Sequence, residues 1–322
     1  MATPQFVSVC TIDALARAAR QLKDGNLIAF PTETVYGLGV DAQNEAAVSR
    51  IYKVKGRPQD HPLIVHIGDW QLMGEWAEEI PDYAIDLART FWPGPMTLIL
   101  KRSELAKDFV TGNQNTVGIR VPNQTLALQL LTEFSKIGGK GIAAPSANRF
   151  GQVSPTTADA VREEIGSFLD KDDSILDGGP CSVGVESTII DCTSANPKIL
   201  RPGAITIEDI KGVTGLEVES PVHSEIRVSG SLENHYAPAA QVILDATPQP
   251  GDGFIALAEI PTPDGVIRLA APKTVEAFAH VLYAALRDTD AKELKRVVVI
   301  QPKGDGIAIA IRDRLIRAAA GR

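Results

Sequence analysis

Short apolar runs alternate with amphipathic helical patterns through the first 200 residues of the chain. The runs are four to six residues long and contain few polar positions, which is typical of strands buried on both faces. Strands that alternate with helices in this way predict an α/β fold. The predicted strands are 6–9, 27–30, 62–67, 96–100, 116–121, 141–145 and 187–192, and 199–203 closes this part of the chain.

Capping residues indicate where the helices between these strands begin and end. Thr11 and Asn44 are suited to begin helices that end near residues 23 and 55, because their side chains accept hydrogen bonds from the first turn. Gly56 and Pro58 end the second of these helices and turn the chain. Pro81 is a good first-turn residue for a helix near 81–91. Further helices are predicted near 124–134 and 157–165.

The pattern breaks between residues 217 and 240, where Pro221, Gly230 and Pro238 lie among polar positions without a regular period. We predict a linker over 217–240. Four strand-like segments and two amphipathic helices, at 274–286 and 308–319, follow it. The chain is therefore expected to form a larger unit over 1–216, the linker, and a smaller α/β unit over 241–322.

Composition narrows the class of protein. The 322 residues are 44% hydrophobic and 22% charged, which is ordinary for a globular protein, and the net charge of −8 argues against broad coating of nucleic acid. Three cysteines without a paired spacing, Cys10, Cys181 and Cys192, are expected to be free thiols. Neither a signal-peptide pattern nor an apolar run of membrane-spanning length is present, so we expect a soluble cytoplasmic protein.

The common catalytic fingerprints are missing from the sequence. It contains no GxxxxGK(S/T), GxSxG or HExxH motif. The stretch "GLGVDA" at 37–42 fits GxGxxA, with Asp60 about 20 residues further on. We interpret the stretch as part of a loop, because six residues separate the preceding strand from the first glycine, and a dinucleotide site is the less favoured interpretation.

Polar loops follow several of the predicted strands. "PTETVYG" at 31–37 offers hydroxyl groups and Glu33, and "KVKGRPQDHPLIVH" at 53–66 concentrates positive charge at a helix end. Arg120 lies inside an otherwise apolar strand, where it is costly to bury without an anion. Each feature alone has an ordinary structural explanation, such as a helix cap or a cation at a helix C-terminus.

Two further loops and one arginine also carry candidate ligand-binding side chains. "APSANRFGQVSPTT" at 144–157 places hydroxyl groups at a helix start, and "DGGPCSVGVESTII" at 177–190 is a glycine-rich entry to a strand that carries Glu186, Ser187 and Thr188. "ILRPG" adds Arg201. Open α/β sheets bind ligands beyond their strand ends, and these side chains suit phosphates and carboxylates. The sequence therefore predicts an anion site that works by positioning and charge stabilisation, as in phosphoryl or nucleotidyl transfer.

These loops together resemble the motifs of a known family. The segments "FPTETVYGLG", "KVKGRPQDHPLIVH", "FWPGPMTLIL", "TVGIRVP", "APSANRFGQVSPT", "DGGPCSVGVESTIID" and "ILRPG" are similar to those of the YrdC-type threonylcarbamoyl-AMP synthases, in order and spacing, over about residues 8–215. "NHYAP" at 234–238 and the trailing α/β unit resemble the longer, two-domain form of that family. The resemblance implies a twisted mixed sheet with a concave, positively lined cleft, a linker across the cleft mouth, and a Rossmann-like C-terminal domain.

The resemblance also implies a reaction. L-Threonine and bicarbonate form N-carboxythreonine, whose carboxylate attacks the α-phosphate of ATP to give threonylcarbamoyl-AMP and pyrophosphate. That product serves the t6A modification of tRNA adenosine 37, completed by other proteins, with the tRNA an indirect partner. Mg²⁺ is expected with ATP, held chiefly by the phosphates and at most by one or two protein side chains.

Site residues follow from the resemblance position by position. Threonine-binding positions are implied at Thr34, His66, Arg120 and Ser187. Catalytic roles are implied for Lys55 and Arg57. ATP-binding positions, some of them shared, are implied at Lys55, Arg57, His61, Thr116, Ala144, Ser146, Asn148, Ser154, Arg201 and Tyr236.

The linker departs from the family pattern. It reads "SGSLENHYAP", with Ser229 before the glycine, and Glu233 and Asn234 stand where basic residues are common. Two other functions stay open from the sequence. One is a non-enzymatic RNA-binding factor that uses the same cleft, and the other is a carbamoyl-transfer domain that serves metallocentre maturation.

Overall fold

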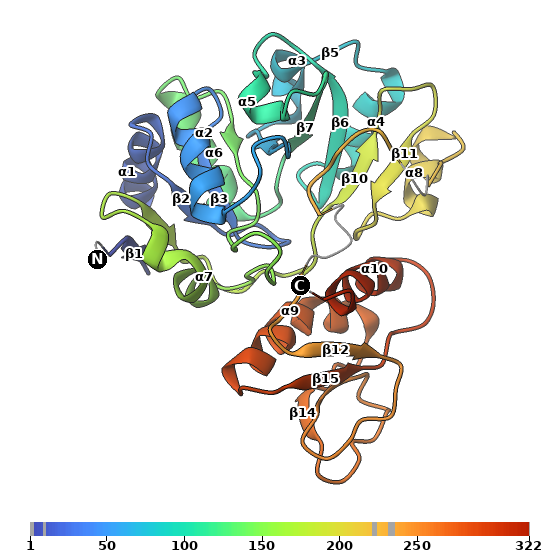
Figure 1. Ribbon diagram of the computed structural model, residues 1–322. Coiled ribbons are helices and arrows are strands. Elements are labelled where there is room, and N and C mark those ends of the chain that lie inside the picture. Colours follow the sequence, from blue (N-terminus) through green and yellow to red (C-terminus); the bar gives the residue numbers. More distant parts are fainter. Residues whose placement is uncertain (1–2, 9–10, 221–223, 231–235, 322) are drawn as a thin grey trace.

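The computed structural model describes residues 3–8, 11–220, 224–230 and 236–321. Figure 1 shows a large unit of sheet and helices from the first two thirds of the chain, with a smaller unit, coloured orange to red, packed below it. Helix α10 (Ile307–Ala319) of the smaller unit lies on the side that faces the larger one. The two units are therefore in contact.

Within the described residues, eleven strands form one sheet in the larger unit, in the order β1-β9-β2-β3-β8-β4-β7-β6-β10-β11, with β5 on β6. Parallel and antiparallel neighbours both occur, so the sheet is mixed and the predicted fold class is confirmed. The strands are β1 (Gln5–Val7), β2 (Ile28–Phe30), β3 (Gly37–Asp41), β4 (Ile64–His66), β5 (Ala77–Glu78), β6 (Met96–Arg102), β7 (Thr116–Arg120), β8 (Ile142–Ala143), β9 (Ser174–Leu176), β10 (Thr188–Asp191) and β11 (Lys198–Arg201).

Helices cover this sheet, and the long ones begin where the sequence predicts. Thr11 caps α1 and Asn44 caps α2, each accepting a hydrogen bond from the helix, and Gly56 ends α2 in a left-handed conformation. The helices of the larger unit are α1 (Ile12–Lys23), α2 (Glu45–Lys55), α3 (Met73–Trp76), α4 (Asp82–Phe91), α5 (Asp108–Thr111), α6 (Thr125–Lys136), α7 (Ala158–Ile165) and α8 (Ile207–Thr214), with short 3₁₀ turns η1 (Trp70–Leu72) and η2 (Gly166–Phe168).

Segments near the start of the chain differ from the sequence-based prediction. The stretch "GLGVDA" is mostly strand β3, antiparallel to β2, and not a phosphate-binding loop. Glycine is required at Gly39 because a Cβ atom there would lie 2.7 Å from both the Ile142 and Phe30 side chains. The predicted first strand, 6–9, corresponds to β1, which begins one residue earlier, and residue 9 lies outside the described residues.

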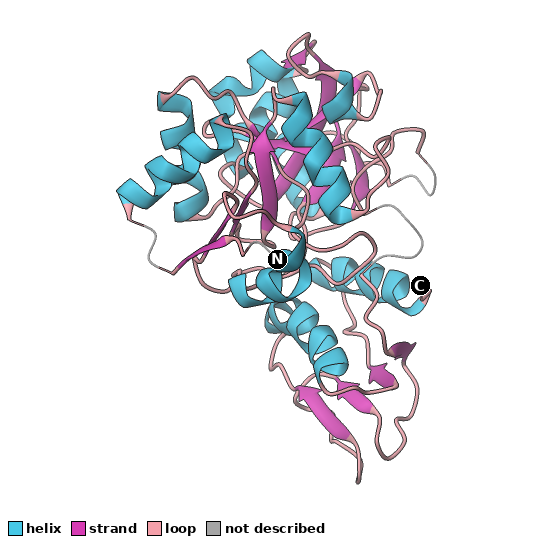
Figure 2. Ribbon diagram, turned by 60° about the vertical axis from the view of Figure 1, so that its left-hand side comes forward, coloured by secondary structure: helices cyan, strands magenta, loops and turns pink. Residues whose placement is uncertain are grey.

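The smaller unit is a parallel sheet with two helices, which confirms the Rossmann-like expectation for this part of the chain. Its strands run in the order β12-β15-β13-β14, and each pairs with its neighbours in parallel. Figure 2 shows its helices between this sheet and the larger unit. The elements are β12 (Gln241–Leu244), β13 (Gly253–Ile255), β14 (Ile267–Ala270), α9 (Val275–Ala291), β15 (Arg296–Val299) and α10.

One hydrophobic cluster joins the two units. Phe278 and Leu282 of α9 belong to it, and so do Val35, Val153 and Val185 from loops of the larger unit. Docking of the smaller unit therefore buries apolar surface of three loops that carry candidate site residues.

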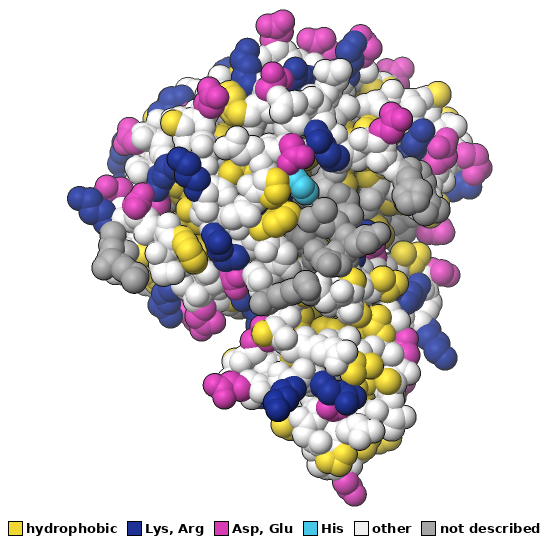
Figure 3. Space-filling view, in the orientation of Figure 1, with side chains coloured by type: hydrophobic (Ala, Val, Ile, Leu, Met, Phe, Trp, Pro, Cys, Tyr) yellow, Lys and Arg dark blue, Asp and Glu magenta, His cyan; other side chains and the backbone are white. Residues whose placement is uncertain are grey.

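The structure bears on the expectations about membrane-spanning segments, cysteines and surface charge. Among the residues that the structure describes, no helix is long and apolar enough to cross a membrane. Cys181 and Cys192 are free and buried, as expected, while Cys10 lies outside the described residues. On the face drawn in Figure 3, acidic and basic side chains are interspersed.

Candidate active site

A pocket lies where the ends of several strands of the large sheet meet the linker. It encloses about 540 Å³ of empty space, part of it open to solvent. Nine of the residues that the sequence implicates line it, namely Thr34, Arg57, His66, Arg120, Ala144, Ser146, Ser187, Arg201 and Tyr236. Thr32, Val35, Gly37, Ile64, Pro145, Glu186, Ser229 and Gly230 complete the lining.

Strand pairing places His66 beside Arg120. Each is the last residue of its strand, β4 or β7, and the two pair directly in the parallel register. Arg120 donates to Thr34 Oγ1 at 2.9 Å and forms an ion pair of 2.8 Å with Glu33, in the loop after β2. Both partners hold a guanidinium that is almost fully buried.

This end of the pocket keeps polar atoms available for a ligand. Within the described residues, Nε of Arg120 and Nδ1 of His66 have no hydrogen-bond partner. Burial, and then the positive charge of Arg120, lowers the pKa of His66 to about 3, so its imidazole is neutral at physiological pH. A neutral imidazole beside a buried arginine can accept or donate one hydrogen bond while the arginine binds a carboxylate.

A second end of the pocket is lined by Arg57 and Arg201. Arg57 follows the left-handed turn at Gly56 and donates to Pro62 O at 2.9 Å and to Ser229 Oγ at 3.1 Å. Arg201 donates through Nη1 to Ser229 O at 2.8 Å. The linker is thus held at Ser229 by both arginines.

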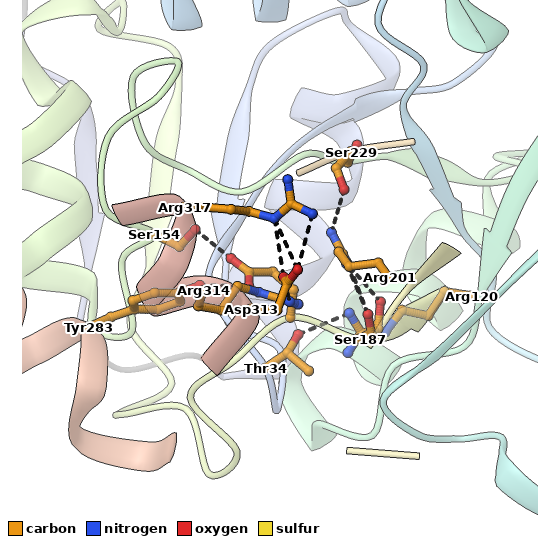
Figure 4. A network of polar contacts seen from close by, with 11 residues as sticks. Thr34, Arg120, Ser154, Ser187, Arg201, Ser229, Tyr283, Asp313, Arg314 and Arg317 are labelled. Carbon is orange, nitrogen blue, oxygen red and sulfur yellow. Dashed lines mark hydrogen bonds and ion pairs between the residues drawn. The ribbon is translucent and has the colours of Figure 1, made fainter. Parts of the chain in front are cut away.

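Ser187 lies between the two ends. Its carbonyl oxygen accepts hydrogen bonds from Nε and Nη2 of Arg201, at 3.1 and 2.9 Å, and its hydroxyl is 2.8 Å from Thr97 Oγ1. Figure 4 shows Arg201, Ser187, Arg120 and Thr34 next to one another. Ser187 therefore connects the region of Arg120 with that of Arg201.

Lys55 does not line the pocket. Its buried ammonium group donates to Ser146 O at 2.6 Å and also to Asn148 O. Burial, together with the charge of Arg57, holds the pKa of Lys55 well below its usual value. Lys55 therefore holds the loop after β8 in place, and Ser146 of that loop lines the pocket.

Four other implicated residues also lie outside the lining. Asn148 is buried and donates to Arg149 O and Gln152 O within its own loop. The Ser154 hydroxyl is directly behind the wall, 2.7 Å from Glu186 Oε1. Thr116 is at the other end of β7 from Arg120, and the His61 ring packs edge-on against Phe150, with ring centroids 5.4 Å apart.

Glu186 is a pocket residue that was noted in its loop but not assigned a role from the sequence. Its carboxylate accepts hydrogen bonds from Ser154, Tyr283 and Arg314, the last two on α9 and α10. Burial alone would raise the pKa of Glu186, but Arg314 and Arg201 lower it to about 2. No local signal marks its contacts with α9 and α10, because those partners lie about 100 residues or more along the chain.

Metal binding by protein side chains is not indicated. The described residues hold no group of three or more histidine, cysteine or acidic side chains suited to a metal ion. Glu186, in the pocket lining, is paired with Arg314, and Glu33 is paired with Arg120.

Charge and fold together define the class of protein. Three arginines, Arg57, Arg120 and Arg201, line the pocket together with one carboxylate, Glu186, which is already paired with Arg314. The pocket therefore suits a ligand with separate anionic groups. A mixed sheet with such a pocket is the YrdC-like α/β architecture. Escherichia coli YciO has the same fold at 21% identity, with a TM-score of 0.52 over 62% of this chain and 95% of that chain.

Sequence comparison identifies the family. Residues 20–203 match the Sua5_yciO_yrdC model, described as "Telomere recombination", and residues 205–320 match "Threonylcarbamoyl-AMP synthase, C-terminal domain". The threonylcarbamoyl-AMP synthase of Pyrococcus abyssi is 38% identical, over 95% of this chain and 94% of the relative. The chain belongs to the threonylcarbamoyl-AMP synthase family, which confirms the resemblance found in the motifs.

Two further relatives agree. The threonylcarbamoyl-AMP synthase of Bacillus subtilis is 37% identical, over 96% of this chain and 93% of the relative. The crystal structure of P. abyssi Sua5 complexed with L-threonine has a TM-score of 0.87 and 36% identity, over 98% of this chain and 97% of that chain. Both the larger and the smaller unit thus have counterparts in full-length relatives.

Proposed function

We propose that this protein is a nucleotidyltransferase that makes L-threonylcarbamoyladenylate and pyrophosphate from L-threonine, bicarbonate and ATP. The observation that carries the proposal is the pocket itself, whose lining holds Arg120 beside His66 and also Arg57 and Arg201, which both bind Ser229. Two anionic substrates need two such groups of side chains. The likeness to a Sua5 structure that holds L-threonine supports this assignment.

Threonine is assigned to the end formed by Arg120, Thr34, His66 and Ser187. Arg120 is already oriented by Glu33 and Thr34, and its free Nε suits the amino-acid carboxylate. The neutral His66 ring does not repel an ammonium or compete for the carboxylate. This end therefore fixes the amino acid with its amine directed to the rest of the pocket.

ATP is assigned to the end formed by Arg57, Arg201, Ser146, Ala144 and Tyr236. Lys55, Asn148 and Ser154 act from behind this wall, Lys55 by holding the carbonyl oxygens of the loop after β8. His61 and Thr116 keep a nucleotide-binding role on the basis of the resemblance alone. We expect the loop from 144 to 154 to set the position of the nucleotide.

The chemistry needs little from the protein beyond orientation and charge. Threonine nitrogen condenses with bicarbonate, losing water, and the resulting carbamate oxygen bonds to the α-phosphorus while the bond to the pyrophosphate oxygen breaks. Arg57 and Arg201 stabilise the negative charge that develops on the phosphate oxygens. We expect Mg²⁺ to come bound to ATP, where it would neutralise phosphate charge.

The product's proposed use is the t6A modification of tRNA adenosine 37, which sets the protein among cytoplasmic t6A enzymes. Other proteins would transfer the threonylcarbamoyl group, so tRNA is an indirect partner. The mixed charges on the face drawn in Figure 3 do not favour broad coating of RNA.

Release of pyrophosphate tests the proposal. The purified protein is expected to release pyrophosphate from ATP only when threonine and bicarbonate are both present. Arg57→Ala should lower the rate by about 10²–10³, by analogy with loss of one oxyanion donor, whereas Arg17→Ala on the exposed face of α1 should not. RNA binding without ATP, and without pyrophosphate release, would overturn the proposal.

A further inference from the structure

Arg314 is an arginine from the smaller unit that is buried next to the pocket. Its exposed fraction is 1%, and it lies on α10. Its Nε atom donates to Glu186 Oε2 at 2.9 Å, and its Nη1 atom donates to Asp313 at 2.6 Å. A side chain of one unit thus reaches Glu186, which lines the pocket of the other.

The Glu186 carboxylate is fully engaged by groups outside the pocket. Oε1 accepts from Ser154 at 2.7 Å, and Oε2 accepts from Tyr283 at 2.7 Å as well as from Arg314. All four of these residues are buried. A carboxylate held by three donors is not available as a base or as a metal ligand, although the residue forms part of the pocket wall.

Tyr236 of the linker contacts both Tyr283 and Arg314. Its ring stacks on Tyr283, with centroids 5.6 Å apart and an interplanar angle of 21°. The Arg314 guanidinium lies over the Tyr236 ring at 5.4 Å. Stacking and cation–π contact of this kind hold the ring in place on the pocket wall.

Glu186 is placed in the chain so that its charge can affect nucleotide binding. It directly precedes Ser187, whose carbonyl oxygen binds Arg201 in the ATP end of the pocket. A Glu186 side chain released from Tyr283 and Arg314 would present a negative charge near the place of a triphosphate. Like charges in a buried site repel strongly, so its orientation should affect nucleotide binding more than threonine binding.

We infer that Arg314 and Tyr283 are positioning residues for the nucleotide: they hold the Glu186 carboxylate away from the triphosphate and keep Tyr236 against the pocket. The inference rests on the proposed function and gives the smaller unit a role in it. Among the described residues, none from α9 or α10 lines the pocket. The smaller unit contributes by contacts to two wall residues, Glu186 and Tyr236.

Tyr283→Phe is the mild test, since it removes one hydroxyl group and keeps the ring. We expect the KM for ATP to rise about tenfold, as for loss of one hydrogen bond to a charged group, with little change in the KM for threonine. Tyr83→Phe is the matched control, because that hydroxyl donates to Ser194 O elsewhere in the larger unit. Equal changes in both KM values, or none, would overturn the inference.

A rescue experiment separates charge from packing. Arg314→Met leaves Glu186 buried without its arginine partner, so it should weaken ATP binding more than Tyr283→Phe and also lower stability. Adding Glu186→Gln removes the uncompensated charge, and the double variant should bind ATP more tightly than Arg314→Met alone. Arg268→Met is the control, since that arginine donates to carbonyl oxygens and Thr262 within the smaller unit.

Equilibrium binding of ATP distinguishes failure of the proposed function from failure of the positioning role. If the unsubstituted protein binds ATP but releases no pyrophosphate, the proposed function fails while the positioning role is still measured through the Kd for ATP. If it is active, but Tyr283→Phe and Arg314→Met bind ATP as tightly as the unsubstituted protein, the positioning role is wrong. A double variant that binds ATP no better than Arg314→Met would also contradict it.

Discussion

At the scale of single residues, the charges around the pocket are fixed by neighbours rather than by solvent. Lys55 donates to the Ser146 and Asn148 carbonyl oxygens, and Arg120 is paired with Glu33. Charges that are held by the protein before a substrate arrives need no rearrangement during the reaction. Lys55 and the buried arginines therefore pre-organise the site, although their burial has a cost in stability.

Burial of His66 also has a cost in stability, and this cost can be measured as a function of pH. Its pKa is about 3 in the folded protein and about 6.5 in the unfolded chain, so between pH 6.5 and 3 only the unfolded state takes up the proton. Folding stability should therefore fall as the pH drops from 6.5 toward 3, by about 1.4 kcal/mol per unit from this group. Urea unfolding at pH 7.5 and pH 5 measures the effect.

The comparison that isolates His66 is His66→Gln, which cannot titrate. At pH 7.5 both proteins have a neutral side chain at this position, and the difference there gives the baseline for the substitution itself. Between pH 6.5 and 5, the variant should lose about 2 kcal/mol less than the unsubstituted protein. An identical loss in both proteins would show that His66 is not kept neutral by the fold.

Residue identities were easier to predict than side-chain directions. Arg120, Thr34 and His66 were implicated from the sequence, and the structure brings them together because strand pairing fixes their neighbours. Lys55 was expected to face the phosphates. Its side chain is instead directed to a loop about 90 residues later, and sequence spacing contains no information on such a long-range contact.

At the scale of elements, the helices with clear caps were predicted well, whereas strand β9, which is defined by its pairing, was not predicted. α1 and α2 begin after Thr11 and Asn44 as expected, because a cap is a local hydrogen bond. Strand β9 is three residues long and was not predicted. It exists through its parallel pairing with β1 and β2, which lie far earlier in the chain.

Asp173, directly before β9, holds this pairing in place. Its buried carboxylate accepts from Leu27 N at 2.8 Å and Asp170 N at 2.7 Å, and it pairs with Arg50 at 2.8 Å. Asp173→Ala should lower the free energy of unfolding by about 3 kcal/mol, since it leaves backbone and charged donors unpaired. Denaturant titration gives the value.

The neighbouring position provides the control for this substitution. Asp172 is exposed, and Asp172→Ala should change the free energy of unfolding by less than about 0.5 kcal/mol. If the two alanine variants were equally stable, the carboxylate of Asp173 would not be what joins α2, β2 and β9.

At the scale of the whole molecule, the contact between the two units is close enough to require a glycine. Gly184 has a φ of +84°, and a Cβ atom there would lie 2.5 Å from Ala279 O of α9. Gly184→Ala should therefore strain the loop and push α9 away from it. We expect a lower melting temperature and faster proteolytic cleavage between residues 217 and 240.

Gly212→Ala is the control for Gly184→Ala, because it makes the same change at a position without a close neighbour. Gly212 lies in α8, and a Cβ atom added there would have no neighbouring atom within 4 Å outside its own helix backbone, so alanine should stabilise the helix by about 0.5–1 kcal/mol. Opposite signs for the two substitutions are the expected result. A stable, protease-resistant Gly184→Ala protein would mean that the units do not depend on this close approach.

The order of strands in the large sheet also has a consequence for synthesis of the protein. Gln5 of β1 pairs with Ser174 of β9, much later in the chain. At roughly 5–20 residues per second, a ribosome needs on the order of 10–30 s to make the chain between them. During this interval one edge of β2, which is entirely buried in the finished fold, has no partner strand. The nascent chain thus carries an apolar sheet edge of the kind that chaperones protect.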